Sequence, residues 1–238
     1  MTAIRPRQEE GRFRGGEWMS GNGEPRVVDA EPLRYLLAIP DGGGEGPHPV
    51  LCFLHGYDEA APMDIRRALT LHGPLRPGNP AISRGFIVVA PQLDRAGDHW
   101  VRHAGDVARI VAEVREAHGG DPRRTYLTGF SFGGNGVLDL GLRLPGTWAA
   151  LWAVDPTRVP QEDPGVPTWL SFGNLARRQK QGFIDALRLH PAVGAAPHGA
   201  RIHEDEGQDH VGSARLAYAD ERIYTWLLSR LLPDPPAR

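Results

Sequence analysis

The feature of this sequence that most restricts its fold is a series of short apolar runs that alternate with longer amphipathic segments. Residues 50–54 are apolar at every position, as is typical of a strand that is covered on both faces of a sheet. Similar runs recur between clusters of Gly, Pro and charged residues, which favour turns. The strands that we expect from these runs are residues 33–40, 50–54, 85–90, 124–130, 149–154, 168–172 and 200–204.

Two segments between or after these runs have the spacing of an amphipathic helix. In the first, apolar residues recur at i, i+3, i+4 and i+7 from Val107 to Val114, before Gly119 ends the segment. The second lies near the C-terminus, and its apolar residues are Ile223, Trp226, Leu227 and Leu231. Strands that alternate with helices build βαβ units, so the sequence predicts an α/β fold with a mostly parallel central sheet and helices on both faces.

The length of 238 residues fits one domain, and no internal repeat or low-complexity linker divides the chain. We expect this single α/β domain to cover residues 26–232. Residues 1–25 are rich in Gly and charge, which predicts a flexible N-terminal arm or a short edge strand. Residues 233–238 are expected to form a frayed tail.

The charge of the chain is nearly balanced, with 27 basic and 29 acidic residues and a formal net charge of -2. Nucleic acids and acidic membranes require a concentrated basic surface, so we expect neither as a partner. No stretch approaches the roughly 20 apolar residues of a membrane helix, and the N-terminus lacks the apolar core of a secretory signal. We therefore predict a cytoplasmic protein, and the sequence leaves its oligomeric state open. The single cysteine, Cys52, excludes a disulfide within the chain and is interpreted as a buried core residue.

The segment Gly129-Phe130-Ser131-Phe132-Gly133-Gly134 is the strongest chemical signal in the sequence. It follows an expected strand and precedes a Leu-rich helical segment, which is the context that a G-x-S-x-G nucleophile turn requires. A sharp strand-to-helix turn exposes the Ser hydroxyl, and the N-terminus of the following helix favours negative charge. The alternative is a Gly-rich turn with a Ser that caps the helix. The order of strand, turn and helix favours Ser131 as a nucleophile.

Two further segments support this interpretation. His55-Gly56-Tyr57 directly follows a strand, where this kind of site supplies one oxyanion N–H, while the residue after the nucleophile supplies the other. The expected donors are the backbone amides of Tyr57 and Phe132. We interpret the His55 ring as a brace for its loop, with contact to substrate as the alternative. His210 follows the last expected strand, in a loop before the last helix, and is the expected general base.

These motifs also resemble those of a known group of enzymes. Residues 121–134 resemble a block in small bacterial esterases of the α/β-hydrolase superfamily, of the phospholipase/carboxylesterase, dienelactone-hydrolase-like and polyhydroxybutyrate-depolymerase-like types. Residues 210–228, and Ala90-Pro91-Gln92 followed by Trp100, are similar to blocks of the same group. The resemblance spans roughly residues 33–232 and is consistent with one domain. It implies the α/β-hydrolase fold and carboxylic-ester hydrolysis without a cofactor. It carries over Ser131, His210 and the two amides.

The acid that should orient His210 is missing from the position where the resembling enzymes usually have it. Ala176 stands at that position, after the penultimate strand. Asp155, at the end of the preceding strand, is the best substitute, because ligands bind at the carboxyl ends of such strands. Its alternative role is to start a turn before a proline. Asn174 is a second candidate that would orient the imidazole without charge. Asp205 and Asp209 are near in sequence, but the side chain of Asp209 is expected to point elsewhere.

Other residues carry weaker signals. Trp100 and Phe130 are expected to line the substrate pocket, with ordinary packing as the alternative. The spacing of His99 and His103, with Asp98 or Asp106, fits a metal site only in part, so we predict a solvated loop and helix start and no metal. Few residues separate Asp155 from the next strand, which leaves no room for a lid domain.

The sequence therefore predicts a serine hydrolase that cleaves an ester or thioester through an acyl-enzyme on Ser131. Its expected partner is a small-molecule ester or an acyl group tethered to a carrier. The alternative is a hydrolase-like binding or non-hydrolytic protein, because the acid of the triad is not evident.

Overall fold

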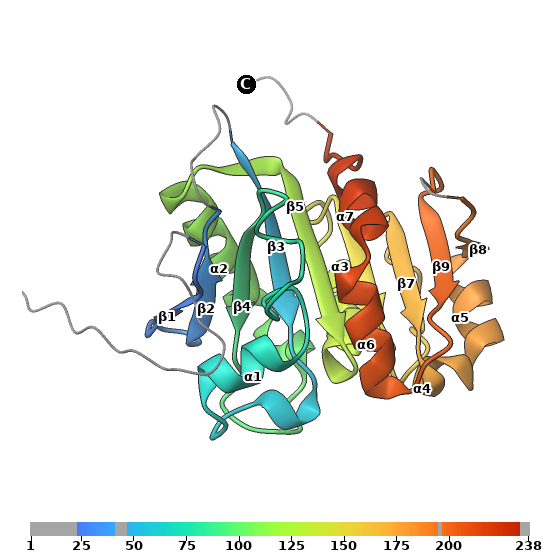
Figure 1. Cartoon of the computed structure of the whole chain (residues 1–238), viewed down its shortest axis with the longest axis horizontal. Coiled ribbons are helices and arrows are strands. Elements are labelled where there is room, and N and C mark those ends of the chain that lie inside the picture. Colours follow the sequence, from blue (N-terminus) through green and yellow to red (C-terminus); the bar gives the residue numbers. More distant parts are fainter. Residues whose placement is uncertain (1–22, 41–46, 195–196, 234–238) are drawn as a thin grey trace, which may run out of the picture.

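The computed structural model describes residues 23–40, 47–194 and 197–233. Within them, nine strands form one sheet in the order β1-β2-β4-β3-β5-β6-β7-β9-β8 (Figure 1). The strands are β1 (Arg26–Val28), β2 (Tyr35–Ala38), β3 (His48–Leu54), β4 (Ile87–Pro91), β5 (Gly120–Phe130), β6 (Ala150–Val154), β7 (Thr168–Phe172), β8 (His190–Pro191) and β9 (Arg201–Asp205). β2 is antiparallel to β1 and β4, and the remaining pairs are parallel.

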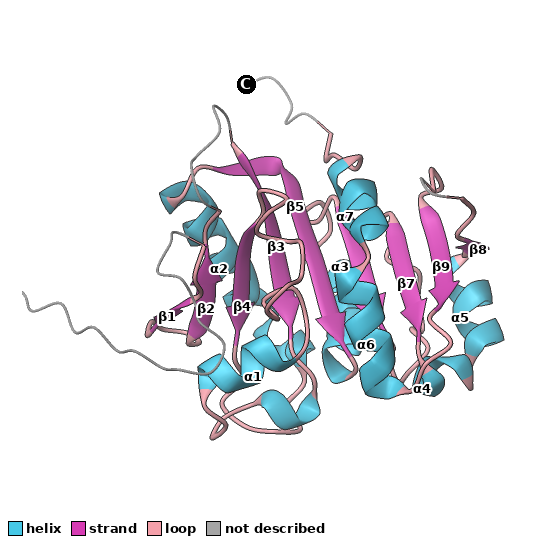
Figure 2. Cartoon of the chain, in the orientation of Figure 1, coloured by secondary structure: helices cyan, strands magenta, loops and turns pink. Residues whose placement is uncertain are grey.

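Helices cover both faces of this sheet (Figure 2). The helices are α1 (Ile65–Leu71), α2 (Ala104–Ala117), α3 (Phe132–Arg143), α4 (Asn174–Arg177), α5 (Lys180–Leu187), α6 (His210–Ala219) and α7 (Glu221–Leu228), with 3-10 turns η1 (Tyr57–Glu59) and η2 (Trp100–His103). The predicted α/β architecture, mostly parallel with helices on both faces, is confirmed.

The alternation of side chains along β3 shows how the sheet separates two apolar layers. Val50, Cys52 and Leu54 pack in the layer with α2, α3 and α5. Leu51 and Phe53 pack in the opposite layer with α1, α6 and α7. All five side chains are fully buried, which explains why this strand is apolar at every position. Cys52 is thus a core residue, as expected, and burial raises the pKa of its thiol.

The sequence located the central strands well and the edge of the sheet less well. β7 has the predicted bounds, whereas the edge strands β1 and β8 and the helices α1, α4 and α6 were not predicted. α7 ends at Leu228, so Leu231 lies beyond the helix to which the apolar spacing assigned it. Most of the N-terminal arm and most of the C-terminal tail lie outside the described residues. The single-domain assignment stays a prediction.

None of the helices among the described residues combines the length and apolarity that crossing a bilayer requires.

A close contact between α3 and the sheet positions the residue that precedes this helix. Gly133, in the first turn of α3, lies against the carboxyl end of β3, and a Cβ atom there would overlap the carbonyl oxygen of Leu54. Gly129, near the end of β5, lies equally close to the backbone of Gly133. The helix and strand backbones therefore touch directly, and larger residues at either position would push them apart.

We expect Gly133→Ala to lower the free energy of unfolding by roughly 3 kcal/mol, because the new methyl group has no space between α3 and β3. Chemical denaturation monitored by Trp fluorescence measures this change. The matched control is Gly105→Ala in α2, where a Cβ meets no atom within 4 Å. We expect that variant to be unchanged or slightly more stable. Equal unfolding midpoints for the two variants would contradict this account of the packing.

Candidate active site

Ser131 occupies a sharp turn between β5 and α3. Its φ of 58° and ψ of -115° lie outside the ordinary regions for a residue with a side chain. Two backbone hydrogen bonds fix this turn. The Ser131 amide donates to the Val154 carbonyl (2.9 Å), and the Asn135 amide donates to the Ser131 carbonyl (3.2 Å). Such strained backbone persists only where its surroundings determine it, which makes the Ser131 hydroxyl a candidate for chemistry.

His210 lies within hydrogen-bonding distance of this hydroxyl, with 2.8 Å between its Nε2 and the Ser131 Oγ. The sequence placed His210 in a loop before the last helix. In the structure it is the first residue of α6, and two helices follow β9. The Asp209 carboxylate caps α6 by accepting the Gly212 amide (2.7 Å), so this side chain points away from the imidazole, as expected.

Asp155 lies on the other side of the imidazole. Its Oδ2 is 2.6 Å from His210 Nδ1, and its side chain is completely buried at the carboxyl end of β6. Burial of a carboxylate is costly unless hydrogen bonds replace the lost water. Here three backbone amides do so: Gly173 (3.0 Å) and Ala176 (2.7 Å) donate to Oδ1, and Leu175 (3.3 Å) donates to Oδ2.

The segment after β7 therefore has a different role from the one that its sequence suggested. Ala176, at the expected position of the acid, donates its amide to the carboxylate that β6 supplies. A Cβ at Gly173 would overlap the Asp155 carboxylate, so a side chain there is excluded. Among the described contacts of His210, Asp155 and Ser131 hold the ring nitrogens, and Asn174 holds neither. Asp205 instead pairs with Arg177 (2.7 Å).

The two backbone amides expected to hold an oxyanion each begin a helical segment. Tyr57 opens η1 and Phe132 opens α3, and first-turn amides of a helix have no acceptor within it. A Cβ at Gly56 would lie 3.5 Å from the Cβ of Ser131, so the loop after β3 runs beside the turn of Ser131. The Gly56 amide donates to the Glu59 carboxylate. Burial raises the pKa of Glu59 to about 7, although this hydrogen bond opposes the shift.

The structure corrects the assignment of His55 and Trp100 to the substrate pocket. Both side chains are 1% exposed. His55 Nε2 accepts the Leu93 amide (3.0 Å), which leaves Nδ1 to donate to the Gly56 carbonyl (2.6 Å). The Trp100 indole donates to the His55 carbonyl (3.2 Å). Both rings brace the loop that carries Tyr57, as interpreted for His55 and as the packing alternative held for Trp100, and neither offers a free polar atom to a ligand.

Aromatic side chains surround the turn of Ser131 on two sides. Phe130 is almost completely buried and packs between His210 and His72, with ring centroids 4.5 and 4.9 Å away. It supports the imidazole more than it lines a pocket. Phe132 packs edge-on against the exposed ring of Tyr57, with centroids 5.7 Å apart. This second pair forms an accessible aromatic wall beside the turn.

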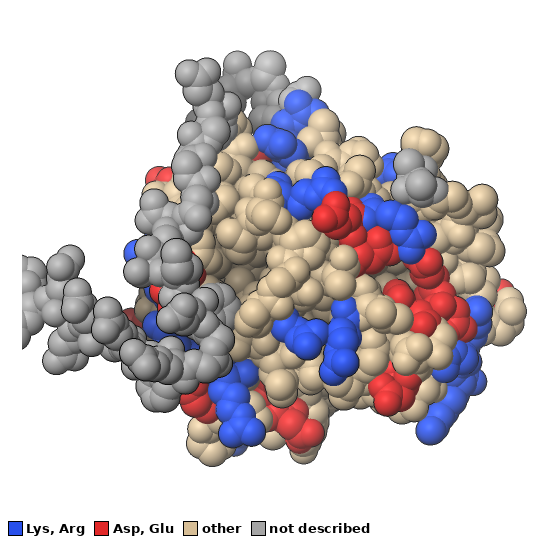
Figure 3. All heavy atoms as spheres, viewed as in Figure 1, with Lys and Arg blue, Asp and Glu red and all other residues tan. Residues whose placement is uncertain are grey.

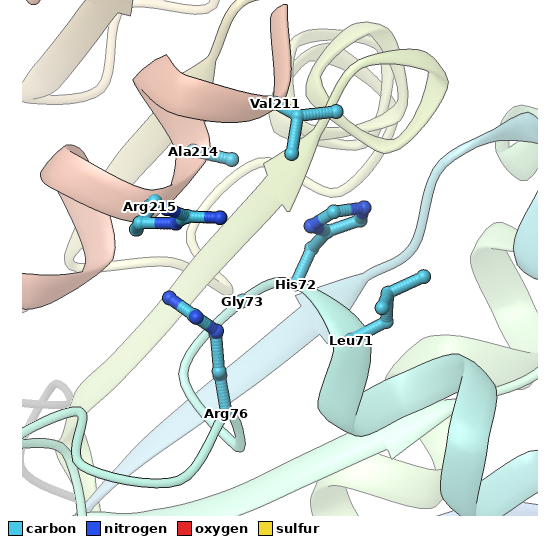
Figure 4. A pocket seen from close by; sticks show the side chains of 7 residues that line it. All are labelled: Leu71, His72, Gly73, Arg76, Val211, Ala214 and Arg215. Atoms are coloured by element: carbon cyan, nitrogen blue, oxygen red, sulfur yellow. The ribbon is translucent and has the colours of Figure 1, made fainter.

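A small open pocket of about 140 Å³ lies beside the start of α6, where Val211 follows His210 in the chain (Figure 4). It is lined by Leu71, His72, Gly73, Arg76, Val211, Ala214 and Arg215. No pattern in the sequence predicts this pocket. Its two arginines belong to no motif, and they lie far apart along the chain.

The residues considered for a metal site hold one another instead. His103 Nε2 lies 3.0 Å from Asp98, and its Nδ1 lies 3.3 Å from Asp106. Nowhere in the described part of the chain do three or more His, Cys, Asp or Glu side chains gather in a way that would hold a metal ion. His99 stacks on Phe132 at the edge of the aromatic wall, with centroids 5.2 Å apart.

The sequence matches no protein-family model and no curated protein. The structure is similar to a thermostable esterase, with a TM-score of 0.69 and 18% identity over 88% of this chain. This chain spans only 64% of that esterase. It is also similar to the fluorophosphonate-binding serine hydrolase FphF of Staphylococcus aureus (TM-score 0.62, 13% identity, 86% of this chain and 97% of that one). An S-formylglutathione hydrolase from Agrobacterium tumefaciens is similar too (TM-score 0.62, 13% identity, 90% and 98%).

Together with the strand order, these similarities define the fold. The chain has the α/β-hydrolase fold, as the sequence resemblance implied.

The buried His55 makes stability depend on pH. Burial lowers the pKa of His55 to about 4, against about 6.5 in the unfolded chain. Its contribution to stability is therefore complete above pH 6.5 and is lost as the pH falls toward 4. Between pH 7.5 and 5, we expect wild type to lose about 2 kcal/mol more than His55→Gln in its free energy of unfolding. Urea denaturation at both pH values measures this difference, and identical pH dependence of the two proteins would contradict it.

Proposed function

We propose that this chain is a serine carboxylesterase-type hydrolase that cleaves an ester or thioester through an acyl-enzyme on Ser131. The observation that carries the proposal is the continuous series of hydrogen bonds from Ser131 Oγ to His210 and from His210 to the buried Asp155. Both imidazole nitrogens are engaged, which favours the tautomer with the proton on Nδ1 and leaves Nε2 free to accept the Ser131 proton.

In the proposed reaction, His210 removes the Ser131 proton as the hydroxyl attacks the carbonyl carbon of the substrate. The tetrahedral intermediate carries its negative charge on the former carbonyl oxygen, which the amides of Tyr57 and Phe132 stabilise. His210 then protonates the departing alcohol or thiol, which leaves an acyl group on Ser131. Water, activated by the same imidazole, hydrolyses this acyl-enzyme and restores the serine.

Asp155 is the proposed acid of this triad. Its negative charge stabilises the imidazolium that forms when His210 takes up the proton. The three amides that hold the carboxylate keep it in place and fix its orientation. This arrangement argues against the alternative of a hydrolase-like protein without a complete triad, since that alternative was based on the missing acid after β7.

The surroundings of Ser131 favour a substrate that enters from solvent without the opening of a lid. Only residues 155–167 separate β6 from β7, and Tyr57 beside the turn is 51% exposed. A small-molecule ester or an acyl group on a carrier would have access to such a site. Solved esterases and hydrolases with similar folds support an ester substrate in general.

We expect Ser131→Ala to abolish labelling by a fluorophosphonate probe and to lower kcat for short p-nitrophenyl esters at least about a thousandfold, because the nucleophile is lost. Gel-based labelling and spectrophotometric assays measure the two effects. Boiled protein controls for labelling without a folded site. Labelling or turnover that survives the substitution would rule out Ser131 as the nucleophile.

We expect Asp155→Asn to lower kcat by about 10⁴, the loss found for the corresponding change in a serine protease, because the neutral amide does not favour the required imidazole tautomer. Asp163→Asn is the matched control, since Asp163 pairs with Arg188 and Arg201 and does not contact His210. We expect its kcat to stay within a few-fold of wild type. Thermal unfolding of both variants separates chemistry from stability, and equal effects on kcat would remove Asp155 from the triad.

A further inference from the structure

We propose that Arg76 and Arg215 form an anion-binding subsite next to His210, and that the preferred substrates are esters that carry a carboxylate or phosphate group. This inference rests on the proposed ester hydrolysis and adds the chemical class of the substrate.

The two arginines come from opposite walls of the pocket of about 140 Å³. Arg76 lies on the connection between α1 and β4, and Arg215 lies on α6, the helix that begins at His210. Their guanidinium groups extend toward each other across the opening (Figure 4). Leu71 and Val211 add apolar surface to the same pocket. The pocket thus combines apolar side chains with two guanidinium groups.

Among the described residues, no carboxylate pairs with the arginines of this pocket. None of its lining residues is acidic. Other arginines on this structure are paired, such as Arg222 with Glu204 and Asp220. By contrast, neither Arg76 nor Arg215 has a side-chain hydrogen bond or ion pair with any of the described residues. On the face seen in Figure 3, basic atoms between α1 and α6 are surrounded by uncharged surface. Two like charges that share a pocket repel, and a bound anion would relieve this repulsion.

The pocket is directly connected to the proposed catalytic residues. Val211, on its wall, follows His210 in the chain. The ring of His72, also on its wall, packs edge-on against Phe130, which in turn packs against His210. Burial lowers the pKa of His72 to about 4, and the charges of the neighbouring Arg76 and Arg215 act in the same direction. His72 is therefore neutral at pH 7, and the positive charge of the pocket belongs to the two arginines.

One carboxylate contacts the ring of His72. Glu59 Oε1 is 3.6 Å from His72 Nε2, and its side chain is only 6% exposed. Its other oxygen accepts the Gly56 amide, and Glu59 is not among the residues that line the pocket.

Guanidinium groups suit this role because their planar donors match the oxygens of a carboxylate or phosphate. A substrate whose reacting carbonyl lies at Ser131 would extend a short chain past His210 and place its anion between the arginines. The anion can belong either to the acyl group or to the leaving group, since both flank the imidazole during the reaction.

The kinetic test compares matched anionic and neutral esters. For the acyl side, mono-p-nitrophenyl glutarate is compared with p-nitrophenyl valerate. For the leaving group, 3-carboxyphenyl valerate is compared with its methyl ester. We expect the ratio of kcat/KM for the anionic to the neutral ester to fall at least tenfold in Arg76→Gln and in Arg215→Gln on one of these two arms. Added NaCl is expected to lower the same ratio in wild type.

The control is Arg109→Gln, an exposed arginine on α2, which covers the opposite face of the sheet. We expect the ratio to stay at the wild-type value in this variant. Unchanged ratios in both Arg76→Gln and Arg215→Gln, on both arms, would overturn the proposal. If neutral esters are hydrolysed in that case, the proposed function survives without the anionic specificity.

Binding of anions tests the subsite without turnover. Isothermal titration calorimetry with glutarate and with inorganic phosphate is expected to show saturable binding to wild type and to Arg109→Gln. The double variant with Arg76→Gln and Arg215→Gln is expected to bind at least tenfold more weakly. Absence of binding to wild type, or equal binding to the double variant, would overturn the subsite even in a protein that hydrolyses no ester. Failure of the proposed function would instead appear as ester hydrolysis that persists in Ser131→Ala.

Discussion

The direct contact between α3 and the carboxyl ends of β3 and β5 is the constraint on which the rest of the structure depends. Gly129 and Gly133 allow helix and strand backbones to touch, so the chain between them must turn sharply at Ser131. The turn between β5 and α3 is thereby held at the edge of the sheet where the parallel strands end (Figure 1). The groups that contact it come from the neighbouring loops, because adjacent parallel strands end side by side.

Burial of charge at this edge is balanced by backbone amides. Asp155 is inaccessible to solvent, and the first turn of α4 supplies amides that replace its lost water. The loop after β3 follows the same principle, since the Glu59 carboxylate accepts the Gly56 amide. The neutral His55 ring fixes that loop through its hydrogen bonds with the Gly56 carbonyl and the Leu93 amide. The polar groups around Ser131 are thus held in place by other protein groups. The proposed catalysis requires this, because hydrogen-bond donors stabilise developing charge best when their positions are fixed before the reaction.

Much of this arrangement could be predicted from local patterns. The buried strands are recognisable because both faces are covered and nearly every residue is apolar, as in β3 and β6. The strand-to-helix turn at Ser131 is visible because its glycines are required by close packing within a few residues. Short edge strands such as β8 escaped prediction, since only two residues pair there and both are exposed. Trp100 was wrongly assigned to the pocket because its position after a strand does not reveal its burial.

By itself, the sequence determined the α/β architecture and the turn that presents Ser131, because both depend on residues that are close along the chain. Only the tertiary structure decided which carboxylate meets His210 and that Ala176 contributes an amide where an acid was expected. It alone also brought Arg76 and Arg215 to one pocket. The physical reason is that these contacts join loops from different strands, and the order of the strands in the sheet sets which loops meet.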